Sequence, residues 1–245
     1  MIILTYKSAG NNQEFSQELI KHLLWDDNWE SYVINESWKV PTNHLGKSGI
    51  IYGAGINGTF FCDHISSQMN WKIYQNSPSW VADLPDFFLK RNVDFMKVAD
   101  VYRSNLSKSK VIRTADGFKR KPVKIDSGRE ISKFGFAPYS IDEGVLVSDD
   151  IDCLTEASVL VSKEKVVQIV YNYGISIKDE DPTSFVETLL RCVDAAPSFV
   201  LDIGYIRNRG WAVLDHHPVW AYVGANKFKT NNYLNALMVS CEKSN

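Results

Sequence analysis

Residues 199–220 constrain this chain more than any other stretch. They show two apolar β-strand patterns joined by a tight turn at residues 208–210. Asp202 and Asp215 each close one of these strands, and His217 follows shortly after the second carboxylate. Carboxylates at this spacing suit a hard cation that also holds phosphate oxygens. Two surface acids that end strands would give the same pattern, so both interpretations stay open from the residues alone.

Composition is typical of a globular protein with a packed core. The 245 residues, 44% of them hydrophobic, suffice for one large domain or two small ones. The net charge of −2 predicts neither nucleic acid nor a membrane as a partner. A basic run over residues 108–124 is a local exception. It is typical either of a lid over an anionic ligand or of a solvated hairpin.

The cysteines and the N-terminus indicate a reducing compartment. Cys62, Cys153, Cys192 and Cys241 are widely spaced and form no metal-type pair, so we expect buried free thiols. Residues 2–6 form a short apolar strand pattern rather than a signal segment, and no apolar run approaches membrane-spanning length. We therefore expect a cytoplasmic protein.

The first part of the chain alternates strand and helix patterns. Strands are expected at 2–6, 32–34 and 49–53, and helices at 13–26 and 60–69. This order predicts a small parallel sheet. The glycine-rich residues 53–58 lack both the dinucleotide spacing and a Gly-Lys-Ser/Thr sequence, so a tight strand-to-helix turn is favoured over a phosphate loop.

A change of composition near residue 78 predicts a domain boundary. After it we expect a helix over 79–92 that Pro85 can interrupt, a strand over 93–98, a hairpin over 156–173, a helix that starts at Pro182, and a last helix over 231–242. Lys97 ends the strand over 93–98. A lysine on an apolar strand is costly to bury unless it meets an anion, either a structural carboxylate or a nucleotide phosphate.

Four motifs follow one another in a recognisable order. They are FMKVAD at 95–100, VLVSD at 145–149, TEASVLV with KVV at 155–167, and VLDIG with WAVLDHHPVW at 200–220. This order resembles the ATP-grasp superfamily, and more narrowly its small stand-alone bacterial and phage members. The resemblance covers roughly residues 79–228.

The resemblance implies an α/β (α+β) ATP-grasp fold. A small N-terminal parallel α/β domain, residues 1–78, would precede an ATP-grasp domain, residues 79–245, whose two α+β subdomains clamp the nucleotide. The implied activity is that of an ATP- and Mg²⁺-dependent ligase, which joins a carboxylate to an amine or similar nucleophile through an acyl-phosphate. ATP and a small carboxylate, amine or peptide substrate are the implied partners.

The same resemblance implies roles for individual residues. Lys97 would contact the ATP phosphates, and the backbone of Val147 and Ser148 would hold adenine. Asp149 or Glu156 would accept hydrogen bonds from the adenine amine or the ribose hydroxyls.

Further roles concern the metal and the anionic groups. Asp202, Asp215 and His217 would carry one or two Mg²⁺ ions. By charge and position, cations that would fold over the phosphates are Arg113, Lys119, Lys121 and Lys124. Arg207 or Arg209 would meet the substrate carboxylate, and Arg209 is taken as the catalytic candidate.

Three departures from the family pattern bear on activity. Val98 replaces the proline that usually follows the strand lysine. Ser158 stands where an arginine is expected, which removes a cation that could hold phosphate. Asp215 and His217 replace a glutamate and an asparagine, and Mg²⁺ prefers oxygen over imidazole.

These departures support two alternative functions. One is a non-catalytic nucleotide-binding or interaction protein on the same fold, as Ser158 and His217 suggest. The other is a metal-dependent hydrolase built on Asp202, Asp215 and His217. His216 would point to the opposite face of its strand, so only one of the adjacent histidines can join the aspartates.

Overall fold

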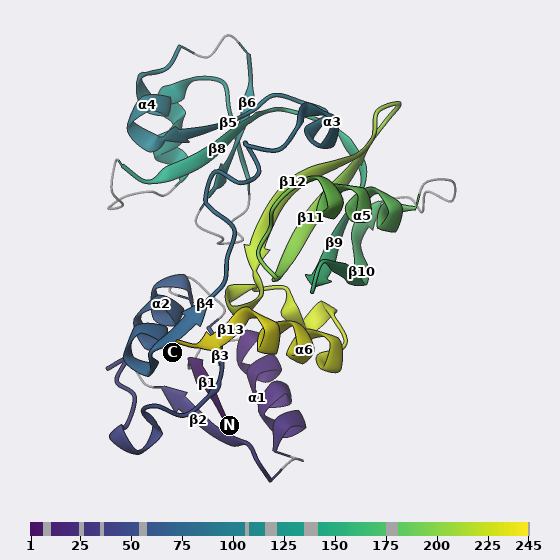
Figure 1. Cartoon of the computed structure of the whole chain (residues 1–245). Helices are drawn as coiled ribbons and strands as arrows, with labels where there is room; N and C mark the ends of the chain where they lie inside the picture. Colours follow the sequence, from purple (N-terminus) through teal and green to yellow (C-terminus); the bar gives the residue numbers. More distant parts are fainter. Residues whose placement is uncertain are drawn as a thin grey trace.

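The computed structural model of the chain describes residues 1–6, 11–24, 27–34, 37–53, 58–105, 108–115, 122–134, 142–174 and 181–244. Within these residues the chain forms a parallel three-stranded sheet, two antiparallel four-stranded sheets and a two-stranded ribbon (Figure 1). The expected mixed α/β architecture is confirmed. No helix in this described part is both long enough and apolar enough to cross a membrane.

The N-terminal sheet has the parallel order β2-β1-β3. Its strands are β1 (Ile2–Tyr6), β2 (Glu30–Ile34) and β3 (Gly49–Tyr52). The helices α1 (Asn11–Leu23) and α2 (Gly58–Met69) lie at opposite sides of these strands (Figure 1). Ile3 and Leu4 of the central strand are fully buried, as a strand covered on both faces requires. The glycine-rich turn before α2 lies largely outside the described residues.

The C-terminal end of the chain returns to this N-terminal sheet. The helix α6 (Thr230–Ser240) contacts β3, and the short strand β13 (Cys241–Lys243) pairs antiparallel with β4 (Trp71–Ile73). Tyr233 and Leu237 of α6 are fully buried in the same core as the N-terminal strands. We therefore propose that residues 219–244 belong to the N-terminal unit together with residues 1–78.

A second unit contains the first antiparallel sheet, with strand order β5-β8-β6-β7. These strands are β5 (Val93–Lys97), β8 (Gly144–Asp149), β6 (Lys110–Thr114) and β7 (Val123–Ile125). The helix α4 (Val98–Arg103) and the 3₁₀ segment η2 (Gly128–Phe134) pack against one face of this sheet. Val145 and Val147 point into that core.

The helix expected over residues 79–92 is interrupted at Pro85, as the sequence allowed, and is shorter than expected. The helix α3 covers only Asp86–Leu89, and the residues before it form turns. Pro85 stands directly before α3 in an extended conformation, with ψ of 140°. Because proline has no backbone N–H and fixes φ, it starts a new helical turn here rather than continuing an earlier one.

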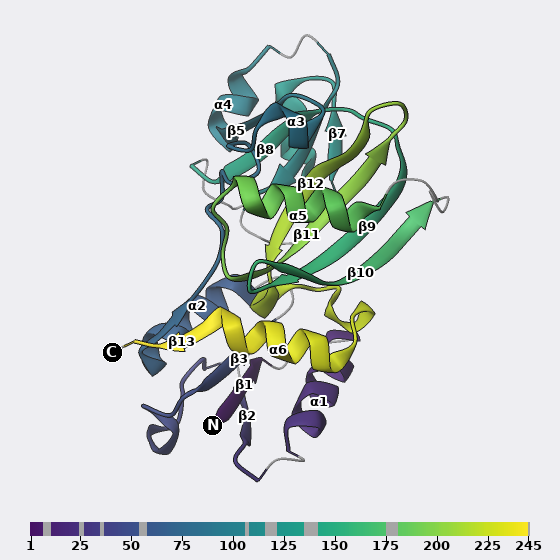
Figure 2. The same cartoon turned by 45° about the vertical axis from the view of Figure 1, so that its right-hand side comes forward.

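A third unit contains the second antiparallel sheet, with strand order β10-β9-β11-β12. Its strands are β9 (Cys153–Ser162), β10 (Lys165–Gly174), β11 (Ser198–Ile206) and β12 (Gly210–Pro218). The helix α5 (Pro182–Cys192) crosses one face of this sheet (Figure 2). It starts as predicted, since Asp181 accepts a hydrogen bond from the Thr183 amide at 2.8 Å. The opposite face carries the polar residues described next.

Candidate active site

Three strands of the second sheet bring their polar residues to one place. Asp202 on β11 lies opposite Asp215 on β12 and opposite Ser158 on β9. Directly paired residues point to the same face of a sheet. The register with β12 shifts immediately after Asp202, so that Leu214 is left without a partner. Such a bulge bends the strand and redirects its side chains. The hairpin predicted from the sequence therefore does present two carboxylates side by side.

Asp202 is the centre of a hydrogen-bonded network. Its Oδ1 accepts from Ser158 Oγ at 2.5 Å, and its Oδ2 lies 3.1 Å from His217 Nε2. The Ser158 hydroxyl also lies 3.0 Å from the Tyr222 hydroxyl. We call this network, with the two residues that extend it to the surface, the Asp202 cluster; its members are Ser158, Asn172, Asp202, His217, Tyr222 and Lys227.

The Asp202 cluster runs from the interior to solvent. Ser158 and Tyr222 are fully buried, and His217 is 1% exposed, whereas Lys227 is exposed. Buried polar groups are tolerated only when their hydrogen bonds are made, and these hydrogen bonds satisfy the buried members of the cluster. The network therefore fixes the orientation of Asp202 before any ligand arrives.

At this place, burial and neighbouring charges shift the pKa of the Asp215 carboxyl. Burial raises the pKa of the Asp215 carboxyl above its usual range, and the neighbouring Asp202 charge adds to the effect. His217 and Arg113 act in the opposite direction and favour the ionised carboxylate. Two neighbouring carboxylates in a poorly solvated place are a setting in which a bound cation would relieve repulsion.

Arg113 reaches this site from the first antiparallel sheet. It pairs with Leu146 on β8, so it points away from the α4 core that holds Val145 and Val147. Leu146, the strand partner of Arg113, packs in the core of the second antiparallel sheet, so Arg113 lies on the face of its own sheet that is turned towards that second sheet. The candidate site is therefore the place between the two antiparallel sheets, with cations on one side and carboxylates on the other.

Buried Arg91 ties these two sheets together. It lies two residues before β5, and its guanidinium donates to the carbonyl oxygens of Val213 at 2.6 Å and Leu214 at 3.4 Å. Both acceptors lie at the β12 bulge. Burial lowers the pKa of Arg91 to about 10, which leaves the side chain charged at neutral pH. Arg91 thus holds the bulge beside Asp215 in position.

Comparison with known proteins places this arrangement among described folds. No family model and no curated protein matches the sequence of the chain. The structure of D-cycloserine synthetase DcsG matches with a TM-score of 0.65 and 10% identity, over 97% of this chain and 99% of that one. The D-alanine–D-alanine ligase of Coxiella burnetii matches with a TM-score of 0.58 and 11% identity, over 98% and 94%. A RimK domain ATP-grasp protein of Sphaerobacter thermophilus matches with a TM-score of 0.55 and 7% identity, over 97% and 98%.

The chain has the ATP-grasp fold. The resemblance of its motifs to that superfamily is thereby confirmed at the level of the fold. The resemblance to ATP-grasp proteins predicts a nucleotide bound between two α+β subdomains. The two antiparallel sheets described above correspond to these subdomains.

Lys97 lies at the end of β5 on the same face as Arg113, since it pairs with Gly144, two residues before Leu146 on β8. Its ammonium lies 3.2 Å from the Asp142 carboxylate, and the Lys97 side chain is 58% exposed. An exposed ion pair contributes little to stability. The sequence predicts an anion next to Lys97, and in the structure this anion is the exposed carboxylate of Asp142.

Val147 and Ser148 lie in the middle of their sheet. The strand β8 pairs with β5 on one side and with β6 on the other at both residues. Their backbone N–H and C=O groups therefore belong to the ladders, which argues against the predicted contact with adenine. The next backbone groups along the chain that lie outside these ladders are in residues 150–152, the link between β8 and β9.

Asp149 directly precedes that link, and Glu156 lies in β9, four residues after it. Asp149 accepts from Lys110 Nζ at 2.7 Å, and this hydrogen bond lowers the pKa of the Asp149 carboxyl. Glu156 accepts from the Tyr173 hydroxyl at 2.8 Å and lies opposite Gly204 on β11. Glu156 is thus on the same face of its sheet as Asp202.

The remaining predicted cations are spread out. Lys124 on β7 pairs with Asp150 at 2.6 Å in a largely exposed contact, at the start of the same link. Lys119 and Lys121 lie outside the described residues. Arg207 is exposed in the β11–β12 turn.

Arg209 is not brought to the carboxylates. It lies in the turn of the β11–β12 hairpin, about 13 Å or more along the strand from Asp202. Its guanidinium donates to the Lys90 carbonyl at 3.0 Å and lines a pocket of about 250 Å³ with Phe87 and Trp211. The role predicted for Arg209 followed from its closeness in sequence to Asp202 and Asp215. In an extended hairpin, however, the turn lies far from the middle of the two strands.

The residues only partly fit the predicted magnesium site. Among the described residues, no three acidic, histidine or cysteine side chains are arranged to hold a metal ion. His217 Nε2 lies 3.1 Å from Asp202 Oδ2, so this nitrogen already has a carboxylate as its partner. Asp202 and Asp215 by themselves offer the oxygen ligands that Mg²⁺ prefers. The pair fits a divalent cation, and His217 fits better as the residue that orients Asp202.

His216 lies away from the site, as strand alternation predicts. It is buried and its ring centroid lies 5.4 Å from that of Trp80, in the core on the other face of the sheet. A hydrolase with both histidines as ligands therefore has no support among the described residues.

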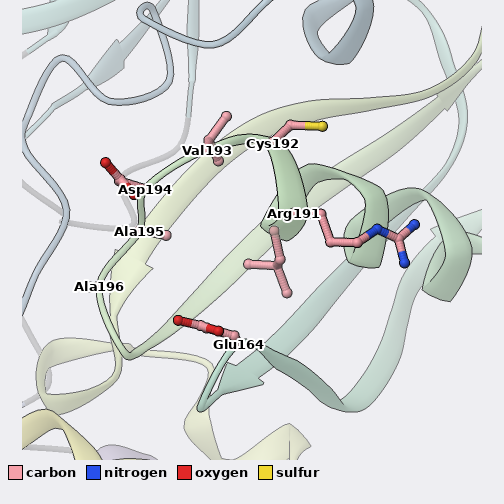
Figure 3. Close-up of a pocket in the computed structure, with 8 residues that line it drawn as sticks. Glu164, Arg191, Cys192, Val193, Asp194, Ala195 and Ala196 are labelled. Carbon is pink, nitrogen blue, oxygen red and sulfur yellow. The ribbon is translucent and has the colours of Figure 1, made fainter.

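A second cavity lies apart from these residues. It has a volume of about 470 Å³ and is formed by Glu164 and residues 190–196, between the β9–β10 turn and the end of α5 (Figure 3). None of the predicted site residues lines it.

Sequence reasoning missed three members of the Asp202 cluster. Tyr222 and Lys227 lie in the segment after β12 that was expected to be a plain loop, and Asn172 lies at a register shift in β10. The nearest available signal was the aromatic and glycine content directly after the DHHP motif. Asn172 had no signal, because a register shift is not visible in the residues.

Proposed function

We propose that this protein is an ATP- and Mg²⁺-dependent ligase, which joins a carboxylate to an amine or a similar nucleophile. The observation that carries the proposal is the Asp202–Asp215 pair on one sheet of the ATP-grasp fold, with Arg113 on the face of the other sheet that is turned towards it. Phosphoryl transfer needs charge neutralisation and in-line positioning more than covalent help from the protein. Carboxylates for a metal on one side and a cation on the other supply the first of these needs.

The proposed reaction has two steps. A carboxylate oxygen of the substrate forms a bond to the γ-phosphorus, and the bond from that phosphorus to its bridging oxygen breaks, so that ADP leaves with the electron pair. The amine then forms a bond to the acyl carbon, phosphate leaves, and the amine loses a proton. A Mg²⁺ ion held by Asp202 and Asp215 would supply neutralisation of phosphate charge. Arg113 and Lys97 would bind phosphate oxygens from the other sheet, Lys97 by exchanging Asp142 for phosphate.

We further propose where the nucleoside binds. The backbone of residues 150–152 is a better candidate for the adenine contact than Val147 and Ser148, because it is not paired in a ladder. Glu156 lies in β9, four residues after this link and on the face of Asp202, and would accept hydrogen bonds from the ribose hydroxyls.

A titration of Mg²⁺ and ATP tests this proposal. We expect Mg²⁺ to strengthen ATP binding in the native protein and not in Asp215→Asn, because the amide removes one anionic ligand. Glu187→Gln, which changes an exposed acid on α5, is the matched control and should keep the magnesium effect. Absence of ATP binding at millimolar concentration, or a magnesium effect that survives Asp215→Asn, would refute the proposal.

A non-catalytic nucleotide-binding protein is the second candidate. It is favoured by one observation, namely that both oxygens of Asp202 already have partners in Ser158 and His217. It predicts ATP binding without ADP release in the presence of any small carboxylate and amine. Release of ADP that depends on an added carboxylate would exclude it.

A further inference from the structure

Ser158 is the centre of a polar network at a position where the family resemblance expects an arginine. Its hydroxyl contacts Asp202 and Tyr222, and it accepts a hydrogen bond from Asn172 Nδ2 at 3.0 Å. An arginine here would place a cation next to the two carboxylates. Serine cannot, so the charge must come from elsewhere if the site is to hold an anion.

Lys227 brings a cation to this place from another element. Its Nζ donates to Asn172 Oδ1 at 2.7 Å, and the other end of the same amide donates to Ser158. Two hydrogen bonds and the width of one amide put the ammonium within about 8 Å of the Ser158 hydroxyl. Asn172 is a neutral acceptor, and this hydrogen bond orients the ammonium.

The segment that carries Lys227 is held firmly against the sheet. Lys227 ends the 3₁₀ segment η4 (Ala225–Lys227), which follows η3 (Val219–Ala221). Between them Gly224 packs so closely on Tyr222 that a Cβ there would lie 2.8 Å from the Tyr222 hydroxyl. The amide of Lys229 then donates to Gln168 Oε1 on β10 at 2.9 Å. The backbone on both sides of Lys227 is therefore held in place next to β10.

We propose that Lys227 replaces the missing arginine and binds the oxygens of the phosphoryl group that the protein transfers, with Asn172 and Ser158 as its positioning residues. This inference rests on the proposed function. A lysine is suited to the role, because its ammonium is a compact charge on a long flexible stem that can follow phosphate oxygens. The exposed end of Lys227 gives a ligand direct access.

The contrast between ATP and ADP tests this inference, because only ATP carries the transferable phosphoryl group. We expect Lys227→Met to weaken ATP binding by about tenfold and to leave ADP binding within about twofold. Lys227→Arg keeps the cation and should bind ATP nearly as the native protein does. Lys229→Met changes a neighbouring exposed lysine and should change neither affinity.

A second variant tests directly whether a cation at position 158 can replace the cation of Lys227. Ser158→Arg in the Lys227→Met background returns a cation from β9 and should recover the preference for ATP over ADP. A purely structural role for Lys227 would lower the melting temperature of Lys227→Met while the ratio of ATP to ADP affinity stayed native, and that result overturns the inference. If the native protein bound neither nucleotide, the proposed function would fail; if it bound both and Lys227→Met kept the native ratio, only the role of Lys227 would fail.

Discussion

Among single residues, the four cysteines differ in environment more than the sequence indicates. We expected all of them to be buried, and Cys62 and Cys241 are. Cys192 at the end of α5 is exposed, and Cys153 is half-buried between Arg91 and Glu156. Burial raises the pKa of the Cys153 thiol to about 11, with Glu156 adding to the effect.

These environments predict the order of thiol modification. The thiolate is the reactive form, so a raised pKa suppresses reaction at neutral pH. Iodoacetamide at pH 8 should label Cys192 first, and Cys153 should react faster only as the pH approaches 11. Mass spectrometry of the native protein, with Cys192→Ser to remove the fast site and Cys153→Ser as its control, measures this order. Equal rates at Cys153 and Cys192 at pH 8 would contradict it.

The residue types at the site could be predicted, but their contacts could not. Asp202 and Asp215 were identified because carboxylates in adjacent strands are visible in the pattern. The pairing of His217 with Asp202, and the bridge from Asn172 to Ser158, depend on strand register. A shift of one residue would reverse the faces, and no local pattern fixes it.

Among the elements, strands and capped helices were predicted best. Both hairpins formed as expected, because alternation and turn residues agree there. The helix expected over 79–92 is interrupted at Pro85, as the sequence allowed, because proline fixes φ and has no backbone N–H. The role predicted for Arg209 stays a prediction, although the structure places Arg209 in the hairpin turn, away from Asp202 and Asp215.

The helix α5 gives a test of an element that was predicted correctly. Asp181→Ala removes the acceptor for the Thr183 amide and should lower the free energy of unfolding by about 1 kcal/mol. Asp181→Asn keeps an acceptor at the cap and should cost less. Urea denaturation followed by circular dichroism measures both. A loss from Asp181→Asn as large as that from Asp181→Ala would show that the cap is not responsible.

In the molecule as a whole, the C-terminal segment packs against the N-terminal sheet. The strand β13 and the helix α6 close the N-terminal core, so the segment that follows β12 is fixed between the second antiparallel sheet and the N-terminal sheet. Trp220 shows this directly, since its carbonyl accepts from the Gly53 amide at 2.8 Å. An apolar C-terminal helix was predicted, but its partner sheet was not, because sequence patterns give faces and not contacts over this separation.

We propose that the nucleotide binds between the two antiparallel sheets, with its phosphates next to Arg113 and the Asp202–Asp215 pair. Isothermal titration of ATP with Mg²⁺ into Arg113→Met and Arg209→Met tests it most directly, because both changes remove one arginine and only the first lies at the site. We predict that Arg113→Met weakens ATP binding by about tenfold and that Arg209→Met binds as the native protein does. Equal affinities for the two variants, or a larger loss from Arg209→Met, would contradict the account.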